Sequence, residues 1–258
     1  MRTDVGEHIR YVMQAGVAEE IRAVKIWRER WGLRRYGFHG LSHSWVARRV
    51  PEMLGGQTTG RRVVSCHLGA GASLCAIRDG RSVDTTMGFT PLEGLVMATR
   101  SGNVDPGMLL WLLEREALSE RELAEALEHR SGLLGLTGDA DMRRVLSAVA
   151  AGDARAVLGL DVYIHRLRAG IAAMVAALGG LDVLVFTGGV GEHAPEVRTR
   201  ACAGLAFLGV AIDPELNAGA RPDADLSAAA SPVRTLVVRA REDAEMARQA
   251  RAVLASRL

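Results

Sequence analysis

A buried strand that runs directly into a glycine-rich turn most restricts how this 258-residue chain can fold. Residues 181–186, LDVLVF, are apolar except for Asp182, as expected of a strand inside a sheet. The run TGGVGE follows, and a helix is predicted from Ala194, with Pro195 near its start. Helix N-termini after glycine turns favour phosphate, because free backbone N–H groups point at the anion. The spacing is not G-x-G-x-x-G, so the dinucleotide fingerprint of the Rossmann fold is excluded.

A second glycine turn, HLGAGAS at residues 67–73, lies inside a predicted antiparallel meander. Strands are expected at 63–66, 73–77 and 82–86, with an Asp-Gly hairpin signature between the last two. Glycines such as Gly69 and Gly71 let a ligand approach the backbone closely, and the turn N–H groups can form an anion nest. A plain hairpin turn has the same composition, so LGAG alone does not identify a ligand site.

Two histidines stand four residues apart in RRYGFHGLSH, residues 34–43. His39 precedes a helix predicted over 41–50, where backbone N–H groups favour anions. A HxxxH pair can also bind zinc, but the metalloprotease form has a glutamate after the first histidine, and this chain has Gly40. The alternative is that His39 and His43 are structural, hydrogen-bonded histidines.

The stretch SVDTTMGFTPLEGLVMATRSGNVDP, residues 82–106, has no helical or strand period beyond its first residues. It is rich in small residues and holds a single arginine, Arg100. Irregular segments of this kind often carry function on a rigid scaffold. A guanidinium offers a planar fork of donors that fits phosphate or carboxylate, so Arg100 is a candidate anion-binding residue. The alternative is one more solvated arginine.

The remainder of the chain is predicted to be mainly helical. Helices are expected over 107–131, with a Ser119–Glu122 capping box, and over 151–178, with a long apolar stripe. Residues 131–144 read as a loop leading into a helix that Asp139 or Asp141 can cap. A strand at 235–240 precedes a closing helix that opens with Glu242, which either caps the helix or binds Mg²⁺.

Composition excludes several classes of protein. The single lysine, Lys25, rules out a P-loop, and the net charge of +2 gives no electrostatic case for nucleic acid or an anionic membrane. Three cysteines without CxxC spacing argue against a disulfide framework or a zinc site. The apolar stretch 170–186 is interrupted by Gly-Gly and Asp, so no membrane span is predicted. The start MRTDVGEHIR lacks an apolar signal region, and we therefore expect a cytoplasmic protein.

Taken together, the motifs resemble the acetate kinase family, which includes acetate, propionate and butyrate kinases. The matching runs are RRYGFHGLSH, HLGAGAS, SVDTTMGFTPLEGLVMATRSGNVDP, SGLLGLTGDADMR, FTGGVGE and the terminal RED/AEMA segment, in the family's order. The resemblance implies an α/β, ribonuclease H-like fold of the actin, Hsp70 and sugar-kinase superfamily. It also implies reversible transfer of the γ-phosphoryl group of ATP to a short-chain carboxylate (acetate, and propionate as a second candidate), and a homodimer.

The resemblance further implies roles for individual residues. His39 and Arg100 would be catalytic and would stabilise the phosphoryl group in transfer. Glu242 would coordinate the Mg²⁺ or Mn²⁺ cofactor. ATP would contact three segments, whose residues are His67, Leu68, Gly69, Ala70 and Gly71; Asp141, Met142 and Arg143; and Gly188, Gly189, Val190, Gly191 and Glu192.

The chain departs from the family pattern at Leu41, Ala70, Asn103, His193 and the segment 240–243. The larger departure is that no run matches the family's N-terminal domain, which supplies further cleft residues. We therefore expect residues 1–60 to be a hinge and helical segment, and residues 61–258 to be the C-terminal nucleotide-binding domain. Three interpretations stay open, namely a truncated or two-chain acetate kinase, an inactive ATP-binding remnant, and a dimerising interaction module.

Overall fold

A computed structural model describes residues 25–56 and 60–256 of the chain. Within the segment 1–60, predicted to be a hinge and helical segment, residues 1–24 and 57–59 lie outside the described residues, and the first described helix is α2, Lys25–Trp31. None of the described helices is long and apolar enough to cross a membrane.

One mixed six-stranded sheet organises the described chain, with the order β3-β2-β1-β4-β6-β5. β1 pairs antiparallel with β2 and parallel with β4, which in turn pairs parallel with β6. The predicted meander is confirmed by the antiparallel β1–β2 and β2–β3 pairs. The strands are β1 (Arg62–Leu68), β2 (Ala72–Arg78), β3 (Arg81–Thr85), β4 (Val183–Thr187), β5 (Ala224–Asp225) and β6 (Arg234–Val237).

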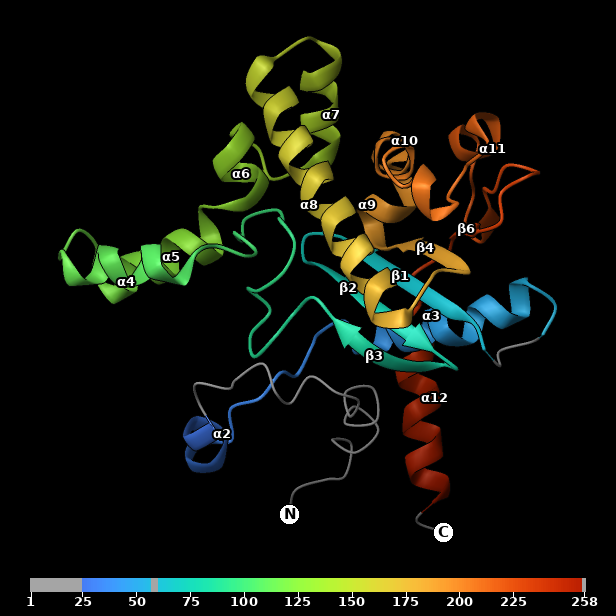
Figure 1. The fold of residues 1–258 in the computed structure, drawn as a ribbon, viewed down its shortest axis with the longest axis horizontal. Coiled ribbons are helices and arrows are strands. Elements are labelled where there is room, and N and C mark those ends of the chain that lie inside the picture. Colours follow the sequence, from blue (N-terminus) through green and yellow to red (C-terminus); the bar gives the residue numbers. More distant parts are fainter. Residues whose placement is uncertain (1–24, 57–59, 257–258) are drawn as a thin grey trace.

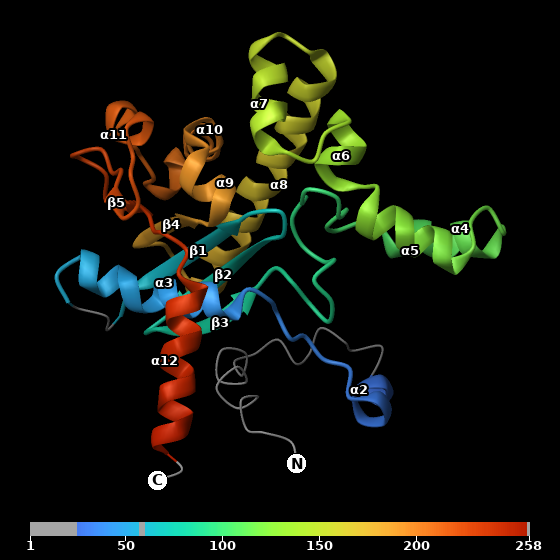
Figure 2. The ribbon, with the colours of Figure 1, turned by 180° about the vertical axis from the view of Figure 1, so that it is seen from behind.

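Helices cover both faces of the sheet. Figure 1 shows α8 (Ala154–Leu178) crossing one face, together with α9 (Gly188–His193) and α10 (Pro195–Ala203). Seen from behind in Figure 2, α3 (Gly40–Met53) and α12 (Glu242–Ala255) lie on the opposite face. The other helices are α4 (Pro106–Glu114), α5 (Glu120–His129), α6 (Gly132–Thr137), α7 (Met142–Ala150), η3 (Ala206–Leu208) and α11 (Pro214–Ala218).

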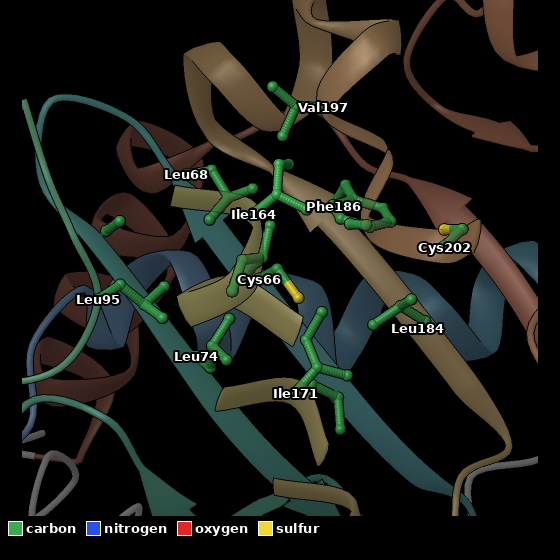
Figure 3. Close-up of a cluster of buried hydrophobic side chains, with 14 of the residues drawn as sticks. Cys66, Leu68, Leu74, Leu95, Ile164, Ile171, Leu184, Phe186, Val197 and Cys202 are labelled. Carbon is green, nitrogen blue, oxygen red and sulfur yellow. The ribbon is translucent and has the colours of Figure 1, made fainter. Parts of the chain in front are cut away.

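The two-residue period of β1 divides its side chains between these two layers. Val64, Cys66 and Leu68 point into the larger core beneath α8, part of which is drawn in Figure 3. Val63 belongs to the smaller cluster that the sheet forms with α3. Ser65 and His67 alternate with the first set, so the same period places them on the α3 face.

Two predictions about the loops are wrong. Residues 132–137 form α6, and residues 188–192 of the predicted glycine turn are already helical, because α9 begins at Gly188. Both helices have only six residues, too few for a periodic pattern to be visible in sequence. The predicted helical region over 107–131 is confirmed as two helices, α4 and α5, and so is the Ser119–Glu122 capping box at the start of α5.

A buried arginine fixes α9 against its neighbours. Arg198 is 1% exposed. Its guanidinium donates to the backbone oxygens of Gly191 and Glu192, at 2.8 and 2.9 Å, and to the side chain and backbone oxygens of Asn217. The carbonyls at the end of a helix carry partial negative charge, so they stabilise this cation.

We expect Arg198→Met to lower the free energy of unfolding by about 3 kcal/mol, because it leaves buried acceptors without donors. Urea denaturation measures the change. The control is Arg200→Met, which removes a partly exposed arginine paired with Glu196 and Asp161 and is expected to lower stability by less than ~1 kcal/mol. Equal losses for the two variants would contradict the structural role given to Arg198.

Candidate functional site

The carboxyl end of β1 is where the predicted site residues gather. Because β1 and β4 run parallel, with His67 opposite Thr187, the segments that follow them meet at one edge of the sheet. Gly188, which opens α9, has a φ of 78°, and a Cβ there would lie 2.8 Å from the Leu68 carbonyl oxygen. Only glycine allows this approach, which packs α9 against the β1–β2 turn.

His39 and Arg100 converge on this turn. A Cβ placed on Gly71 would lie 3.1 Å from His39 Nε2 and 3.3 Å from Arg100 Nη1. His39 is the N-cap residue of α3, as the sequence predicts, and has left-handed backbone angles. Burial and, secondarily, the Arg100 charge lower the pKa of His39 to about 4. At neutral pH a cation and a neutral imidazole therefore face the same point beside Gly71.

Backbone hydrogen bonds hold Arg100 in this position. The Ala98 N–H donates to the Ala70 carbonyl at 3.1 Å, which ties the irregular segment to the β1–β2 turn. The Met97 N–H donates to the Arg100 carbonyl, and the Leu133 N–H donates to that of Met97. The Arg100 guanidinium itself donates to the Pro91 carbonyl at 3.3 Å. The arginine therefore stands on an ordered loop.

Histidines and serines form a polar cluster beneath the turn, which we call the histidine–serine cluster (His39, Ser42, His43, Ser65, His67 and Ser73); His39 and His67 are half-buried and the other four are buried. Ser73 Oγ lies 2.8 Å from His39 Nδ1 and 2.9 Å from His43 Nε2, and Ser65 Oγ lies 2.9 Å from His43 Nδ1. Ser42 Oγ lies 2.8 Å from His67 Nδ1. The rings of His39 and His67 stack with centroids 4.2 Å apart.

All three histidines of the cluster are held neutral near pH 7. Burial, with a contribution from the neighbouring His39, lowers the pKa of His67 to about 3. Burial also lowers the pKa of His43 well below its ordinary value. His39 and His43 share Ser73 as a partner instead of facing one metal, and the described residues include no group of three metal-ligating side chains. The structural interpretation of His43 is thus favoured over a zinc pair.

Glu242 lies at the start of α12, close to the same edge. Its Oε1 is 4.0 Å from His67 Nδ1, and its side chain is 44% exposed. Mg²⁺ in nucleotide sites is commonly held by one or two carboxylates together with substrate phosphates. One accessible carboxylate beside a neutral imidazole fits that donor set. Glu192 differs, because its buried carboxylate accepts from the Ala240 N–H at 2.9 Å.

The predicted nucleotide segment at residues 141–143 lies at the start of α7. Asp141 is the N-cap of α7, accepts from the Arg143 N–H, and is bound by the exposed Arg143 side chain. These hydrogen bonds, led by that of the side chain, lower the pKa of Asp141 to about 2. Met142 is buried. Within the described ranges, no hydrogen bond joins residues 141–143 to the turn at 67–71 or to α9.

Sequence reasoning missed the serines of the cluster. Ser65 and Ser73 occupy inward positions of β1 and β2, where the strand period predicts apolar side chains. A serine at such a position, with a histidine nearby in sequence, was the available signal. Ser42, one helical position before His43, carried no comparable signal.

Comparisons with known proteins find a matching family and similar solved structures. The model of the Acetokinase family matches residues 18–248. The chain is 53% identical to an acetate kinase of Gloeobacter violaceus over 219 residues, 84% of this chain and 54% of that protein. It is 52% identical to an acetate kinase of Leifsonia xyli over 241 residues, 93% of this chain and 58% of that protein. The chain thus spans about half the length of these curated relatives.

Solved structures agree with this result. The crystal structure of Porphyromonas gingivalis acetate kinase matches with a TM-score of 0.85 and 39% identity, over 90% of this chain and 58% of that chain. A propionate kinase from Francisella tularensis matches with a TM-score of 0.81 and 36% identity, over 86% of this chain and 57% of that chain. The predicted ribonuclease H-like α/β fold is confirmed.

The lowered histidine pKa values predict that the protein loses stability in mild acid. The unfolded chain binds a proton at His39 near pH 6.5, whereas the folded chain does so only near pH 4. Unfolding therefore takes up protons in this window, and the free energy of unfolding must fall as the pH is lowered through it. We expect His39→Gln to reduce the fall between pH 7 and 4.5 by ~2 kcal/mol, measured by urea denaturation.

The control for this experiment is His165→Gln, which removes an exposed histidine of α8 outside the cluster. Its stability profile should follow that of the wild type. A His39→Gln profile with the same slope as the wild type would contradict the assignment of a depressed pKa to His39.

Proposed function

Because the chain belongs to the Acetokinase family, we propose that it forms the nucleotide-binding and phosphoryl-stabilising side of a kinase that phosphorylates a short-chain carboxylate. The reaction is the reversible transfer of the γ-phosphoryl group of ATP to acetate or propionate, which gives ADP and an acyl phosphate. The observation that supports it most is the convergence of His39 and Arg100 on Gly71, in the turn between β1 and β2.

In this reaction a carboxylate oxygen attacks the γ-phosphorus and the bond to ADP breaks, so negative charge is spread over the transferring group. Catalysis requires mainly positioning and charge stabilisation. Arg100 supplies a fixed positive charge, and His39 supplies a hydrogen bond from an imidazole that is neutral at pH 7. Their common target beside Gly71 is where the phosphoryl group in transfer would lie.

The nucleotide would be held by backbone and side chains of three segments, 67–71, 141–143 and 188–192. Two of these segments carry glycines and meet at the same edge of the sheet, namely the β1–β2 turn and the start of α9. Backbone N–H groups in such segments are suited to phosphate oxygens. Glu242 would hold Mg²⁺, which supplies neutralisation of phosphate charge when bound. The glycines and Glu242 are proposed as binding residues, and Arg100 and His39 as catalytic residues.

The chain alone is proposed to bind nucleotide without completing the transfer. It spans about half of its relatives, and groups that stabilise a transition state act as a unit. We infer that acceptor binding and closure over the substrates need residues in addition to those of this chain. The division at residue 60, the homodimer and the cytoplasmic location stay predictions.

Substitution of Gly189 tests the proposed nucleotide site without disturbing the fold. It is exposed in α9, and a Cβ there would meet no heavy atom within 4 Å. We expect Gly189→Asp to weaken binding of Mg·ATP to the 258-residue chain at least about tenfold, measured by calorimetric titration, because the carboxylate repels phosphate. Gly189→Ala, which adds volume without charge, is the matched control and should bind within about threefold of wild type. Absence of binding by the wild-type chain would overturn the proposed nucleotide site.

Arg100 is tested in a protein in which this chain is joined to the half that its relatives carry in addition. Arg100→Ala should lower kcat by about 10²-fold or more with little change in the KM for ATP, because the charge is needed mainly in the transition state. Trapping of acetyl phosphate as the hydroxamate measures the rate. Arg121→Ala, an exposed arginine of α5, is the control. An effect confined to KM would mean that Arg100 only binds substrate.

A further inference from the structure

A continuous line of hydrogen bonds runs from the interior of the sheet to His39. It begins at Ser65 Oγ, which lies 2.9 Å from His43 Nδ1. His43 Nε2 lies 2.9 Å from Ser73 Oγ, and Ser73 Oγ lies 2.8 Å from His39 Nδ1. The remaining ring nitrogen, His39 Nε2, is the atom that faces Gly71 alongside Arg100.

The first serine determines the direction of every bond in this line. Ser65 is fully buried, and within residues 25–56 and 60–256 its hydroxyl has no hydrogen-bond partner other than His43 Nδ1. A buried hydroxyl proton without an acceptor is unfavourable, so Ser65 donates to Nδ1. A neutral imidazole carries one proton, which must then be on His43 Nε2 and be donated to Ser73.

The direction of these hydrogen bonds continues from Ser73 to His39. Ser73 accepts from His43, so its own proton is free to be donated to His39 Nδ1. His39 is neutral at pH 7, because its pKa is lowered to about 4, and its single proton must then be on Nε2. The reverse direction would leave the Ser65 proton without an acceptor. It would also turn the Nε2 lone pair toward the point where an anion is proposed to lie.

We propose that Ser65, His43 and Ser73 act as positioning residues that hold His39 in its Nε2–H tautomer, so that His39 donates a hydrogen bond toward the phosphoryl group beside Gly71. The role of this donor rests on the proposed function, whereas the tautomer itself does not. Because the line lies between α3 and the sheet, it also fixes the orientation of the His39 ring. Among the described residues, none of these three has a hydrogen bond or ion pair to the proposed metal ligand Glu242.

The tautomer can be measured on the full 258-residue chain without any ligand. Long-range ¹H–¹⁵N correlation NMR distinguishes Nδ1–H from Nε2–H imidazoles, and the chain has seven histidines. His39→Gln assigns the signal of His39. We expect His39 of the wild type to be protonated at Nε2 at pH 7. An Nδ1–H tautomer would overturn the proposal without any variant having to fold.

Two variants then test the line of hydrogen bonds from Ser65 to His39, which we call the relay. Ser65→Ala and Ser73→Ala each remove one hydroxyl and should increase the Nδ1–H fraction of His39, because the imposed direction is lost. Ser42→Ala removes a hydroxyl of α3 that contacts His67 and is the matched control, expected to leave the His39 tautomer unchanged. A His39 tautomer unaffected by both Ser65→Ala and Ser73→Ala would also overturn the relay.

A kinetic measurement connects the relay to the reaction. In the joined enzyme, Ser73→Ala should lower kcat roughly tenfold with little change in the KM for ATP, because the His39 hydrogen bond is needed in the transition state. A rise in KM with kcat unchanged would overturn the positioning role. Failure of the chain to bind Mg·ATP would instead contradict the proposed function, and the NMR result on the tautomer would stand independently of it.

Discussion

The parallel pairing of β1 with β4 is the constraint on which the remainder of the site depends. It places the carboxyl ends of two central strands at one edge, so the β1–β2 turn and α9 must share that edge. Gly188 then allows α9 to approach the Leu68 carbonyl, and Arg198 holds the far end of α9 through its carbonyl oxygens. The edge that we propose to bind nucleotide is therefore set by the strand order and by these two close contacts.

The site also requires polar side chains at one end of the layer between α3 and the sheet, which is otherwise apolar. Between α3 and the sheet, valines such as Val46 and Val63 pack together, but toward the turn they give way to the histidine–serine cluster. Burying such groups is unfavourable unless each finds a partner, and here the hydroxyls of Ser65 and Ser73 meet imidazole nitrogens. The result is a rigid set of neutral histidines below the point where Arg100 provides the charge.

Much of the fold could be predicted because its elements carry local signals. The long apolar stripe ending at Leu178 predicts α8, the Ser119–Glu122 pair predicts the start of α5, and the Asp-Gly turn predicts the β2–β3 hairpin. The helices α6 and α9 could not be predicted in this way. Each is a short helix rich in glycine, and its conformation depends on packing against α8 or β1 and not on its own period.

The sequence by itself determined the kinds of groups available: two glycine-rich segments, an arginine on an irregular segment, a histidine at a helix N-terminus and a carboxylate that opens the last helix. Only the tertiary structure decided which of them meet. His39 and Arg100 are brought to Gly71 because the Ala98 N–H binds the Ala70 carbonyl and because α3 packs across the sheet. Contacts between residues far apart in sequence leave no periodic trace, since they arise from strand pairing and side-chain burial that form only when the whole sheet is assembled.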